Sequence, residues 1–236
     1  MLLDRLQRLL PRRYEATAAD FELRGCALLC AGLVPVRGAD VLDVGCSVGW
    51  YAAEALARGA RSMTGLDQSN EALAVARRST PEATFIQGSA LDLPFEDASF
   101  DLVTMFNVIE HLPRGSETRL LAEGTRVLRP GGRLALVTPH NHPLPTLADP
   151  AWYFGHRHYS RRRIASFASD AGLRVDRLEL AGGAADTLDL LLYYLSRHLL
   201  RRERHPFDRL RRRADREFQE RAGRNYVVAV AQRCTV

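Results

Sequence analysis

Short apolar blocks alternate with amphipathic stretches along most of this chain of 236 residues. Blocks rich in apolar residues predict strands, at 41–44, 62–66, 84–86, 100–106, 133–138, 173–180 and 225–232. Helical spacing of apolar residues predicts helices at 50–58 and 119–129, a third helix opened by Ser69 as its N-cap, and a fourth that begins at Ser160. Strands and helices that alternate in this way form parallel sheets, so the pattern predicts an α/β fold.

Both flanks of this alternating region are expected to be helical. Residues 14–33 have roughly helical spacing, which predicts an N-terminal helical lid within residues 1–35. Residues 187–224 form a basic helical insert before the last predicted strand, and its leucines share one helical face, namely Leu188, Leu191, Leu192, Leu195 and Leu199. Length and composition fit a single domain over residues 1–236, with room for a full core.

The first predicted strand runs into a turn of small residues, Gly45-Cys46-Ser47-Val48-Gly49, before the next helix begins. Gly45 and Gly49 lack a Cβ, so the backbone can turn sharply and pass close to a ligand beside the unpaired amides of a helix start. The spacing does not match the G-x-G-x-x-G pattern that seats a pyrophosphate in dinucleotide-binding proteins. The turn therefore predicts a binding loop for a small ligand.

Two carboxylates at the ends of neighbouring predicted strands narrow the choice of ligand. Asp43 stands just before the loop, where its charge repels a phosphate and attracts an amino group. Asp67 ends the second predicted strand, at roughly the separation typical of a ribose-binding carboxylate, about 20 residues further on. An amine and a ribose without a phosphate describe S-adenosyl-L-methionine (SAM).

Five segments, taken in chain order, resemble the successive motifs of class I SAM-dependent methyltransferases. They are Val41 to Tyr51, Gly65-Leu66-Asp67, Leu91-Asp92-Leu93-Pro94-Phe95 with Ser99-Phe100-Asp101-Leu102-Val103, Ile109-Glu110-His111-Leu112, and Leu128-Arg129-Pro130-Gly131-Gly132. The Glu110-His111 pair resembles the Glu-His pair of methyltransferases that act on small molecules, including the quinone O-methyltransferases. The resemblance implies a Rossmann-like, doubly wound, mostly parallel seven-stranded sheet with an antiparallel edge hairpin and helices on both faces.

The resemblance also implies a set of cofactor-binding residues, which are Asp43, Gly45, Cys46, Gly49, Asp67, Gln68, Ser89, Ala90 and Asn107. Asp43 is expected to order the loop and attract the amino end of SAM, and Asp67 to bind both ribose hydroxyls. Ser89 stands where related methyltransferases usually carry an aspartate that accepts a hydrogen bond from adenine. Asn107 replaces the first glutamate of the E-x-x-E-H motif through which some quinone O-methyltransferases bind a metal, so no metal is expected.

The acceptor is expected to be a small molecule methylated on a hydroxyl oxygen. A neutral histidine suits the removal of a hydroxyl proton, and we predict His111 as this catalytic base, with His140 as the alternative. Two other functions stay open, an NAD(P)-dependent oxidoreductase and a SAM-binding protein without catalysis. The loop lacks the third glycine of the dinucleotide-binding pattern, which disfavours the oxidoreductase. Ser47, Ser89 and Asn107 differ from the residues common at these positions in the family, which suggests the binding protein without catalysis.

The net charge of +5 lies in the insert, where residues 187–224 carry eleven arginines against six acids. Every basic residue of the chain is arginine, which indicates a compositional bias, so nucleic-acid binding is the least favoured interpretation. The insert could instead be buried against its own domain or form a homodimer through residues 187–204. A third alternative is a membrane-surface helix that admits a lipid-like or quinone-like acceptor.

The four cysteines indicate the compartment. Cys26, Cys30, Cys46 and Cys234 form neither a C-x-x-C pair nor a grouping with histidines, as expected for buried thiols in a reducing cytosol. Charged residues interrupt the apolar N-terminus, and no apolar stretch approaches the ~20 residues of a membrane span. A cytoplasmic protein is therefore predicted.

Overall fold

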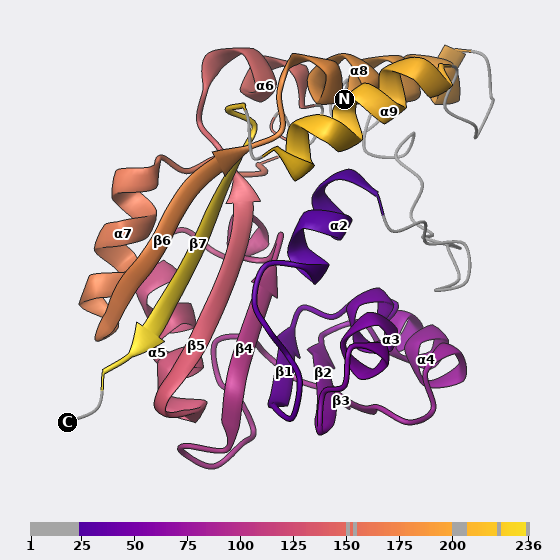
Figure 1. Ribbon diagram of the computed structural model, residues 1–236. Coiled ribbons are helices and arrows are strands. Elements are labelled where there is room, and N and C mark those ends of the chain that lie inside the picture. Colours follow the sequence, from indigo (N-terminus) through magenta and orange to yellow (C-terminus); the bar gives the residue numbers. More distant parts are fainter. Residues whose placement is uncertain (1–23, 150–151, 153–154, 200–206, 221–222, 235–236) are drawn as a thin grey trace, which may run out of the picture.

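A seven-stranded sheet forms the centre of the computed structural model, which describes residues 24–149, 152, 155–199, 207–220 and 223–234 (Figure 1). The strands are β1 (Asp40–Val44), β2 (Ser62–Asp67), β3 (Thr84–Gln87), β4 (Phe100–Phe106), β5 (Leu128–Pro139), β6 (Leu173–Ala181) and β7 (Tyr226–Arg233). Their order is β3-β2-β1-β4-β5-β7-β6, with β1 to β5 parallel and β7 antiparallel to both β5 and β6. The predicted fold class is confirmed, including the antiparallel pair at one edge.

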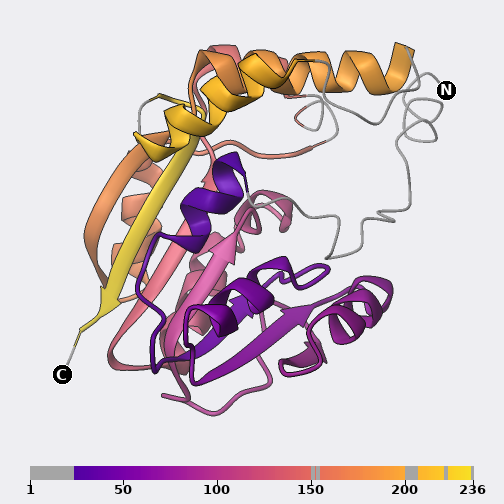
Figure 2. The same ribbon diagram turned by 45° about the vertical axis from the view of Figure 1, so that its right-hand side comes forward.

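Helices cover both faces of this sheet (Figure 2). One face carries α2 (Gly25–Ala31), α3 (Trp50–Ala57) and α4 (Asn70–Ser79), and the other carries α5 (Glu117–Val127) and α7 (Arg161–Asp170). Successive side chains of a strand point to opposite faces. In β4, Leu102 and Phe106 therefore join the core beneath α2 to α4, while Val103 and Met105 join the core beneath α5 and α7.

Three further helices lie together beyond one end of the sheet, at the top of Figure 1. They are α6 (Pro143–Ala148), α8 (Ala184–Leu199) and α9 (Asp208–Gln219). Within the predicted insert at 187–224, residues 187–199 belong to α8 and residues 208–219 to α9, while residues 200–206 and 221–222 lie outside the described part. None of the helices in the described part combines the length and the apolar composition required to cross a membrane.

The leucine face of the insert is not arranged as expected. Leu188 and Leu191 are 47% and 43% exposed, whereas the polar residues Thr187, Asp189 and Ser196 are buried. These two leucines are therefore not packed against their own domain, because the helix turns polar positions toward the body of the molecule, and the second subunit and the membrane surface stay open as alternatives for this face. The side chains at 195 and 199 lie outside the described part.

The start of α2 comes later than the predicted helix at 14–33, of which residues 14–23 lie outside the described part. Gly25, at a φ of +49°, begins the helix, and its N–H donates to Asp215 Oδ1 of α9 at 2.9 Å. The predicted N-cap Ser69 is confirmed, since it accepts from the Ala72 N–H at 3.2 Å. Ser160, predicted only to begin a helix, is the N-cap of α7 and accepts from the Arg163 N–H at 3.3 Å. Residues 1–23 of the predicted lid lie outside the described residues as well.

The fifth strand begins before its predicted start at residue 133. Leu128 pairs with Phe100 and Arg133 pairs with Leu102, so the register shifts at the residues between them. A Cβ on Gly132 would lie 2.9 Å from the Arg129 carbonyl oxygen, which explains a glycine at this irregularity. The apolar pattern missed the first part of β5 because this part consists of polar and turn residues.

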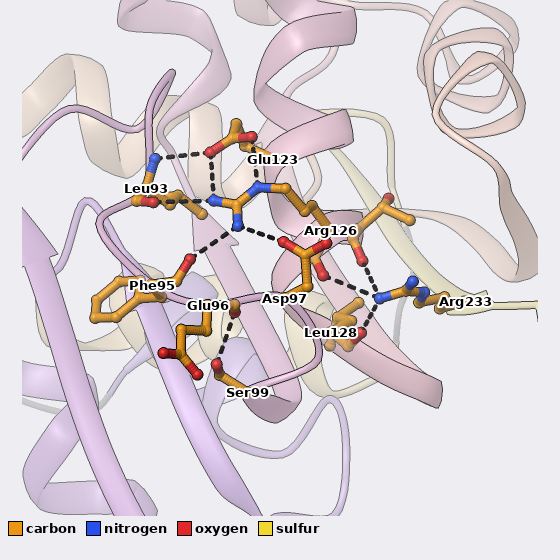
Figure 3. Close-up of polar contacts among 10 residues, drawn as sticks. Leu93, Phe95, Glu96, Asp97, Ser99, Glu123, Arg126, Leu128 and Arg233 are labelled. Carbon is orange, nitrogen blue, oxygen red and sulfur yellow. Dashed lines mark hydrogen bonds and ion pairs between the residues drawn. The ribbon is translucent and has the colours of Figure 1, made fainter.

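Arg126 of α5 holds the connection between β3 and β4 in place (Figure 3). Its guanidinium donates to the Glu123 carboxylate at 2.9 Å, to the carbonyls of Leu93 and Phe95 at 2.9 and 2.8 Å, and to Asp97 at 2.8 Å. Arg233 of β7 donates to the carbonyls of Thr125 and Arg126 in the last turn of α5 and to that of Leu128 at the start of β5. The planar guanidinium of Arg126 thus fixes a connection that has no regular secondary structure.

Candidate active site

A cavity of about 710 Å³ opens at the carboxyl ends of β1, β2 and β4. The strand order reverses direction between β1 and β4, which is where open α/β sheets bind their ligands. The loop after β1 contributes Gly45 and Ser47, the end of β2 contributes Asp67, and the turn after β4 contributes Asn107 and His111. On the opposite side the wall comes from α2 and the residue before it, through Arg24, Cys26, Ala27 and Cys30.

The loop after β1 depends on its two glycines for different reasons. Gly45 has a φ of +74°, and a Cβ at this position would come within 2.6 Å of Val108 Cγ2. Its N–H donates to the Leu66 carbonyl at 2.7 Å, which holds the loop across the end of β2. Gly49 has a φ of +79° at the start of α3, and its Cβ would lie 2.9 Å from Ala76 Cβ of α4. Gly45 therefore shapes the cavity wall, while Gly49 allows α3 to approach α4.

Asp67 joins the two turns that border the cavity. Its Oδ2 accepts a hydrogen bond from the Ser47 N–H at 2.9 Å, and its Oδ1 accepts one from the Ser69 N–H at 2.9 Å. Each carboxylate oxygen has more than one lone pair, so both can accept further bonds from a ligand. The carboxylate is thus held in place and still lines the cavity.

Asp43 lies beneath the loop and not in the cavity wall. It is only 3% exposed, and the Thr104 hydroxyl donates to its Oδ1 at 2.7 Å. Burial raises the pKa of Asp43 to about 7, opposed by the Thr104 hydrogen bond and increased by the nearby charge of Asp67. Burial, followed by the charges of Asp43 and Asp67, also raises the pKa of the Cys46 thiol. Burial beneath the loop therefore favours the protonated forms of both Asp43 and Cys46.

A second cavity of about 270 Å³ adjoins the first, and Asn107 and His111 line both. Its other lining residues include the acidic and imidazole side chains Glu110, Asp149, His156, His158 and Asp186. Asn107 has a φ of +56°, and its N–H donates to the Val137 carbonyl at 2.8 Å. Burial raises the pKa of Asp186 to about 6, opposed by a hydrogen bond from Asn225. Protonatable groups thus surround this second cavity.

Glu110, His111 and His156 meet where the two cavities join. Glu110 is 1% exposed, and its Oε2 accepts from the Thr138 hydroxyl at 3.0 Å. Its Oε1 lies 3.8 Å from His156 Nε2 and has no hydrogen-bond partner among the described residues. Burial raises the pKa of Glu110 to about 7, while His156 and Thr138 oppose the shift. Burial, and then the neighbouring His156, lowers the pKa of His111.

Asp149 orients the histidines of the second cavity. Its Oδ2 lies 2.8 Å from His156 Nδ1 and 2.9 Å from His158 Nε2, both within hydrogen-bonding distance. The Thr146 hydroxyl lies 2.9 Å from the other ring nitrogen of His158. The rings of His111 and His156 lie 4.7 Å apart between centroids, so this network extends to the wall of the first cavity.

Comparison with known proteins identifies the domain to which this cavity belongs. Residues 42–136 match the sequence model of the family described as "Methyltransferase domain", which ends within β5. This region is a class I SAM-dependent methyltransferase domain. SAM is the cofactor of this family.

Individual relatives agree with this identification of the methyltransferase domain. A protein of Mycolicibacterium smegmatis, described as a probable S-adenosylmethionine-dependent methyltransferase, is 35% identical over 140 residues, 59% of this chain and 53% of the relative. A ubiquinone biosynthesis O-methyltransferase of Paracidovorax citrulli is 36% identical over 107 residues, 43% of this chain and 44% of the relative. The chain thus spans about half the length of the curated relatives it matches.

The fold of the methyltransferase domain also recurs among solved structures. An S-adenosylmethionine-dependent methyltransferase from Mesorhizobium loti superposes with a TM-score of 0.62 at 20% identity, covering 87% of this chain and 96% of the other. At this identity the likeness shows the shared fold and no more.

The predicted cofactor residues of the methyltransferase domain divide into two groups. The cavity wall includes Gly45, Asp67, Gln68, Ala90 and Asn107. The remaining four, which are Asp43, Cys46, Gly49 and Ser89, are not among the residues that line it. The Ser89 hydroxyl instead accepts from the Leu91 N–H at 3.1 Å, so it is engaged within its own turn.

The two predicted catalytic histidines lie in different surroundings. His111 lines both cavities, whereas His140 lines neither. His140 Nδ1 lies 2.8 Å from the Arg224 carbonyl oxygen, so its ring connects the end of β5 to the segment before β7. Burial lowers the pKa of His140, opposed by this contact with Arg224.

Sequence reasoning missed the residues that only tertiary contacts bring to the site. The sequence indicated no role for His156 or Asp149, which line the second cavity, and Cys26 and Cys30 were expected to be buried thiols although they line the first. The helical spacing of α2 was the available signal for a lid, but it does not specify which face meets the cofactor cavity. Nothing local to His156 indicates that it approaches Glu110.

Proposed function

We propose that this protein is a SAM-dependent methyltransferase that transfers a methyl group to a hydroxyl oxygen of a small molecule. The observation that carries the proposal is the position of the second cavity, which adjoins the cofactor cavity across Asn107 and His111. An acceptor bound there would lie beside the carboxyl end of β4, where the methyl group of SAM is expected. A volume of about 710 Å³ is in the range of cofactor sites, and the second cavity suits a smaller molecule.

The proposed roles of the cofactor residues follow their positions. Asp67 binds both ribose hydroxyls, Gly45 lets the methionine part pass close to the backbone, and Ala90 borders the adenine. Asp43 acts from beneath the loop, where an ammonium group on the cofactor would favour its ionised form. Methyl transfer is an in-line displacement, so alignment of the two ligands and exclusion of water are the main tasks of the protein.

The hydroxyl acceptor must lose a proton as its oxygen attacks the methyl carbon. We propose His111 as the group that handles this proton, because it lines both cavities. His140 has less support, since it lines neither cavity and contacts the Arg224 carbonyl instead. An oxygen acceptor is favoured over nitrogen by the relative named as a ubiquinone biosynthesis O-methyltransferase. The cytoplasmic location predicted from the sequence belongs to this proposal.

Calorimetry and methyl-transfer assays test this function. We expect Asp67→Asn and Asp67→Ala to weaken SAM binding by about 100-fold or more, since hydrogen bonds to a charged group contribute roughly 1.5–3 kcal/mol each. His111→Ala should bind SAM as the unchanged protein does and lose turnover with hydroxyl acceptors. Binding of NAD(P)H in place of SAM would refute the proposal. Tight SAM binding without transfer to any hydroxyl compound would favour a binding protein that lacks catalysis.

A lipid-like or quinone-like acceptor is the second candidate, and one observation favours it. The second cavity is lined by Pro145 and Ala148 of α6 and by Leu190 of α8. The same two helices expose Leu144, Leu147, Leu188 and Leu191. An apolar rim at a cavity mouth could admit an amphiphilic acceptor from a membrane surface. Cosedimentation with anionic vesicles, lost in Leu144→Ser and Leu188→Ser, would support this candidate; a concentration-dependent dimer lost in these variants would support a homodimer instead.

A further inference from the structure

We propose that Glu110, His111 and His156 form a binding site for one divalent transition-metal cation, such as Zn²⁺, where the two cavities join. No metal was expected from the sequence, because Asn107 stands where the metal-binding motif of some quinone O-methyltransferases has its first glutamate. The structure offers a third donor from a distant loop. The site itself does not depend on the proposed methyl transfer, whereas its use in that reaction does.

The three side chains already lie close enough to share one ion. One carboxylate oxygen of Glu110 and one ring nitrogen each of His111 and His156 all lie within 4.8 Å of one another. Zinc ligands lie about 2.1 Å from the metal, so two of them are roughly 3.4 Å apart in a tetrahedral site. The observed 3.8 Å between Glu110 Oε1 and His156 Nε2 is close to this spacing and too long for a hydrogen bond.

Glu110 supplies an independent sign that a ligand belongs here. Buried polar atoms nearly always have a hydrogen-bond partner. Glu110 Oε1 is buried, has no such partner among the described residues, and belongs to a side chain that lines the second cavity. A cation between Glu110 and the two imidazoles would satisfy this oxygen, and it would also favour the ionised carboxylate in its buried position.

Groups around these side chains orient them as partners of metal ligands do. The Asp149 carboxylate lies 2.8 Å from His156 Nδ1, which leaves Nε2 directed toward Glu110. A carboxylate that bonds the second nitrogen of a histidine is the usual support of a metal-bound imidazole. On the other side, the Thr138 hydroxyl holds Glu110 Oε2. Both donors therefore have their rotation restricted before an ion binds.

Arg157 positions the loop that carries His156. Its Nη2 donates to the carbonyls of Ile109 at 2.6 Å and Leu112 at 2.5 Å, and its Nη1 forms an ion pair with Glu117. The Arg157 N–H also donates to the Glu110 carbonyl at 3.3 Å. These bonds hold the loop on the turn η2 (Ile109–His111), so they bring His156 beside the other two donors.

The donor set indicates the class of ion. Two imidazoles and one carboxylate suit zinc and other transition metals better than Mg²⁺ or Ca²⁺, which prefer oxygen ligands. Three protein ligands would leave a coordination position for the contents of the second cavity. An acceptor hydroxyl there would lose its proton to water more readily, its oxygen would form the new C–O bond, and the C–S electron pair would leave with S-adenosylhomocysteine. His111 would then act as a ligand and not as a free base.

Metal binding by the full chain, without SAM or acceptor, tests the site. The protein is stripped with a chelator, dialysed against Zn²⁺ and analysed for bound metal by elemental analysis and calorimetry. We expect one tightly bound zinc, loss of at least 100-fold in affinity in Glu110→Gln and in His156→Asn, and a loss of 10- to 100-fold in Asp149→Asn. Circular dichroism and thermal unfolding of each variant separate loss of a ligand from loss of the fold.

Two controls make the outcome decisive. His140→Asn, on the same side of the molecule but outside the three donors, should keep its zinc. Cys26 and Cys30, whose Sγ atoms lie 4.0 Å apart, are the competing donors, so Cys26→Ser should also keep the metal. The Co²⁺ derivative should show four-coordinate absorption bands without thiolate charge transfer. Zinc retained in folded Glu110→Gln and His156→Asn, or no zinc in the unchanged protein, would overturn the inference, whether or not methyl transfer is detected.

Discussion

The stability of the fold should depend on pH through Asp43, because its carboxyl is buried and pairs with no cation among the described residues. The substitution Asp43→Asn keeps the shape of the side chain and an oxygen that can accept from the Thr104 hydroxyl. It removes the ionisation. Because burial raises the pKa of Asp43 to about 7 in the folded protein, the native state keeps a proton that the unfolded chain releases near its ordinary pKa of about 3.9.

The sign and size of the effect follow from this difference in pKa. Below about pH 3 both states are protonated, so the buried carboxyl costs nothing through ionisation. As the pH rises to about 7, the unfolded state alone ionises, and stability falls by about 1.4 kcal/mol per unit. Between pH 5 and pH 8 the unchanged protein should therefore lose about 2.6 kcal/mol that Asp43→Asn does not lose, given a folded pKa of about 7.

Urea unfolding at pH 5 and pH 8, without cofactor, measures this difference. Other buried acids titrate in the same range, among them Glu110 and Asp186, but they contribute equally to both proteins and cancel in the comparison. Asp101→Asn is the matched control. Partial burial acts to raise the pKa of Asp101, but hydrogen bonds from the Asp40 amide and Arg129 lower it overall, so its titration lies below pH 5. Equal losses in the unchanged protein and Asp43→Asn would refute the reasoning.

Two further predictions concern the loop and its surroundings. Gly45→Ala should destabilise the fold by about 1–3 kcal/mol and weaken SAM binding, because it adds a clash with Val108 to a positive φ. Gly38→Ala, with a similar φ and open space around it, should show only the backbone part, measured by thermal unfolding and calorimetry. Arg126→Lys should cost about 1–2 kcal/mol in urea unfolding, since an ammonium cannot reach all four partners of the guanidinium. Arg119→Lys, which replaces a single bond to the Leu91 carbonyl, should cost less, and equal costs would contradict the bridging role.

Most of the fold could be predicted because its signals are local. The strands β1 and β4 are buried on both faces, so most of their residues are apolar and their bounds are evident. Ser69 and Ser160 accept from backbone amides three residues further on, as the N-cap pattern requires. β5 was the exception, since its first part contains turn residues and a register shift.

The candidate site could be predicted only in part. Asp67 ends β2 and Asn107 directly follows β4, and parallel strands present those ends at one edge of the sheet, so both line the cavity. Cys46 and Gly49 belong to the same turn as Gly45, yet Cys46 points its sulfur toward Gly65 of β2 and Gly49 packs against Ala76 of α4. Spacing along a tight turn does not reveal the direction of each residue, because the backbone reverses within a few positions.

The amino-acid sequence alone determined the succession of strands and helices, the helix starts and the acids at the strand ends, because these depend on neighbours a few positions away. Only the tertiary structure decided that His156 approaches Glu110 and that Leu188 is exposed. Both features depend on how distant segments pack. His156 reaches Glu110 because the neighbouring Arg157 donates to the carbonyls of Ile109 and Leu112, which lie far earlier in the chain. Contacts of this kind arise from the folded backbone and have no local pattern.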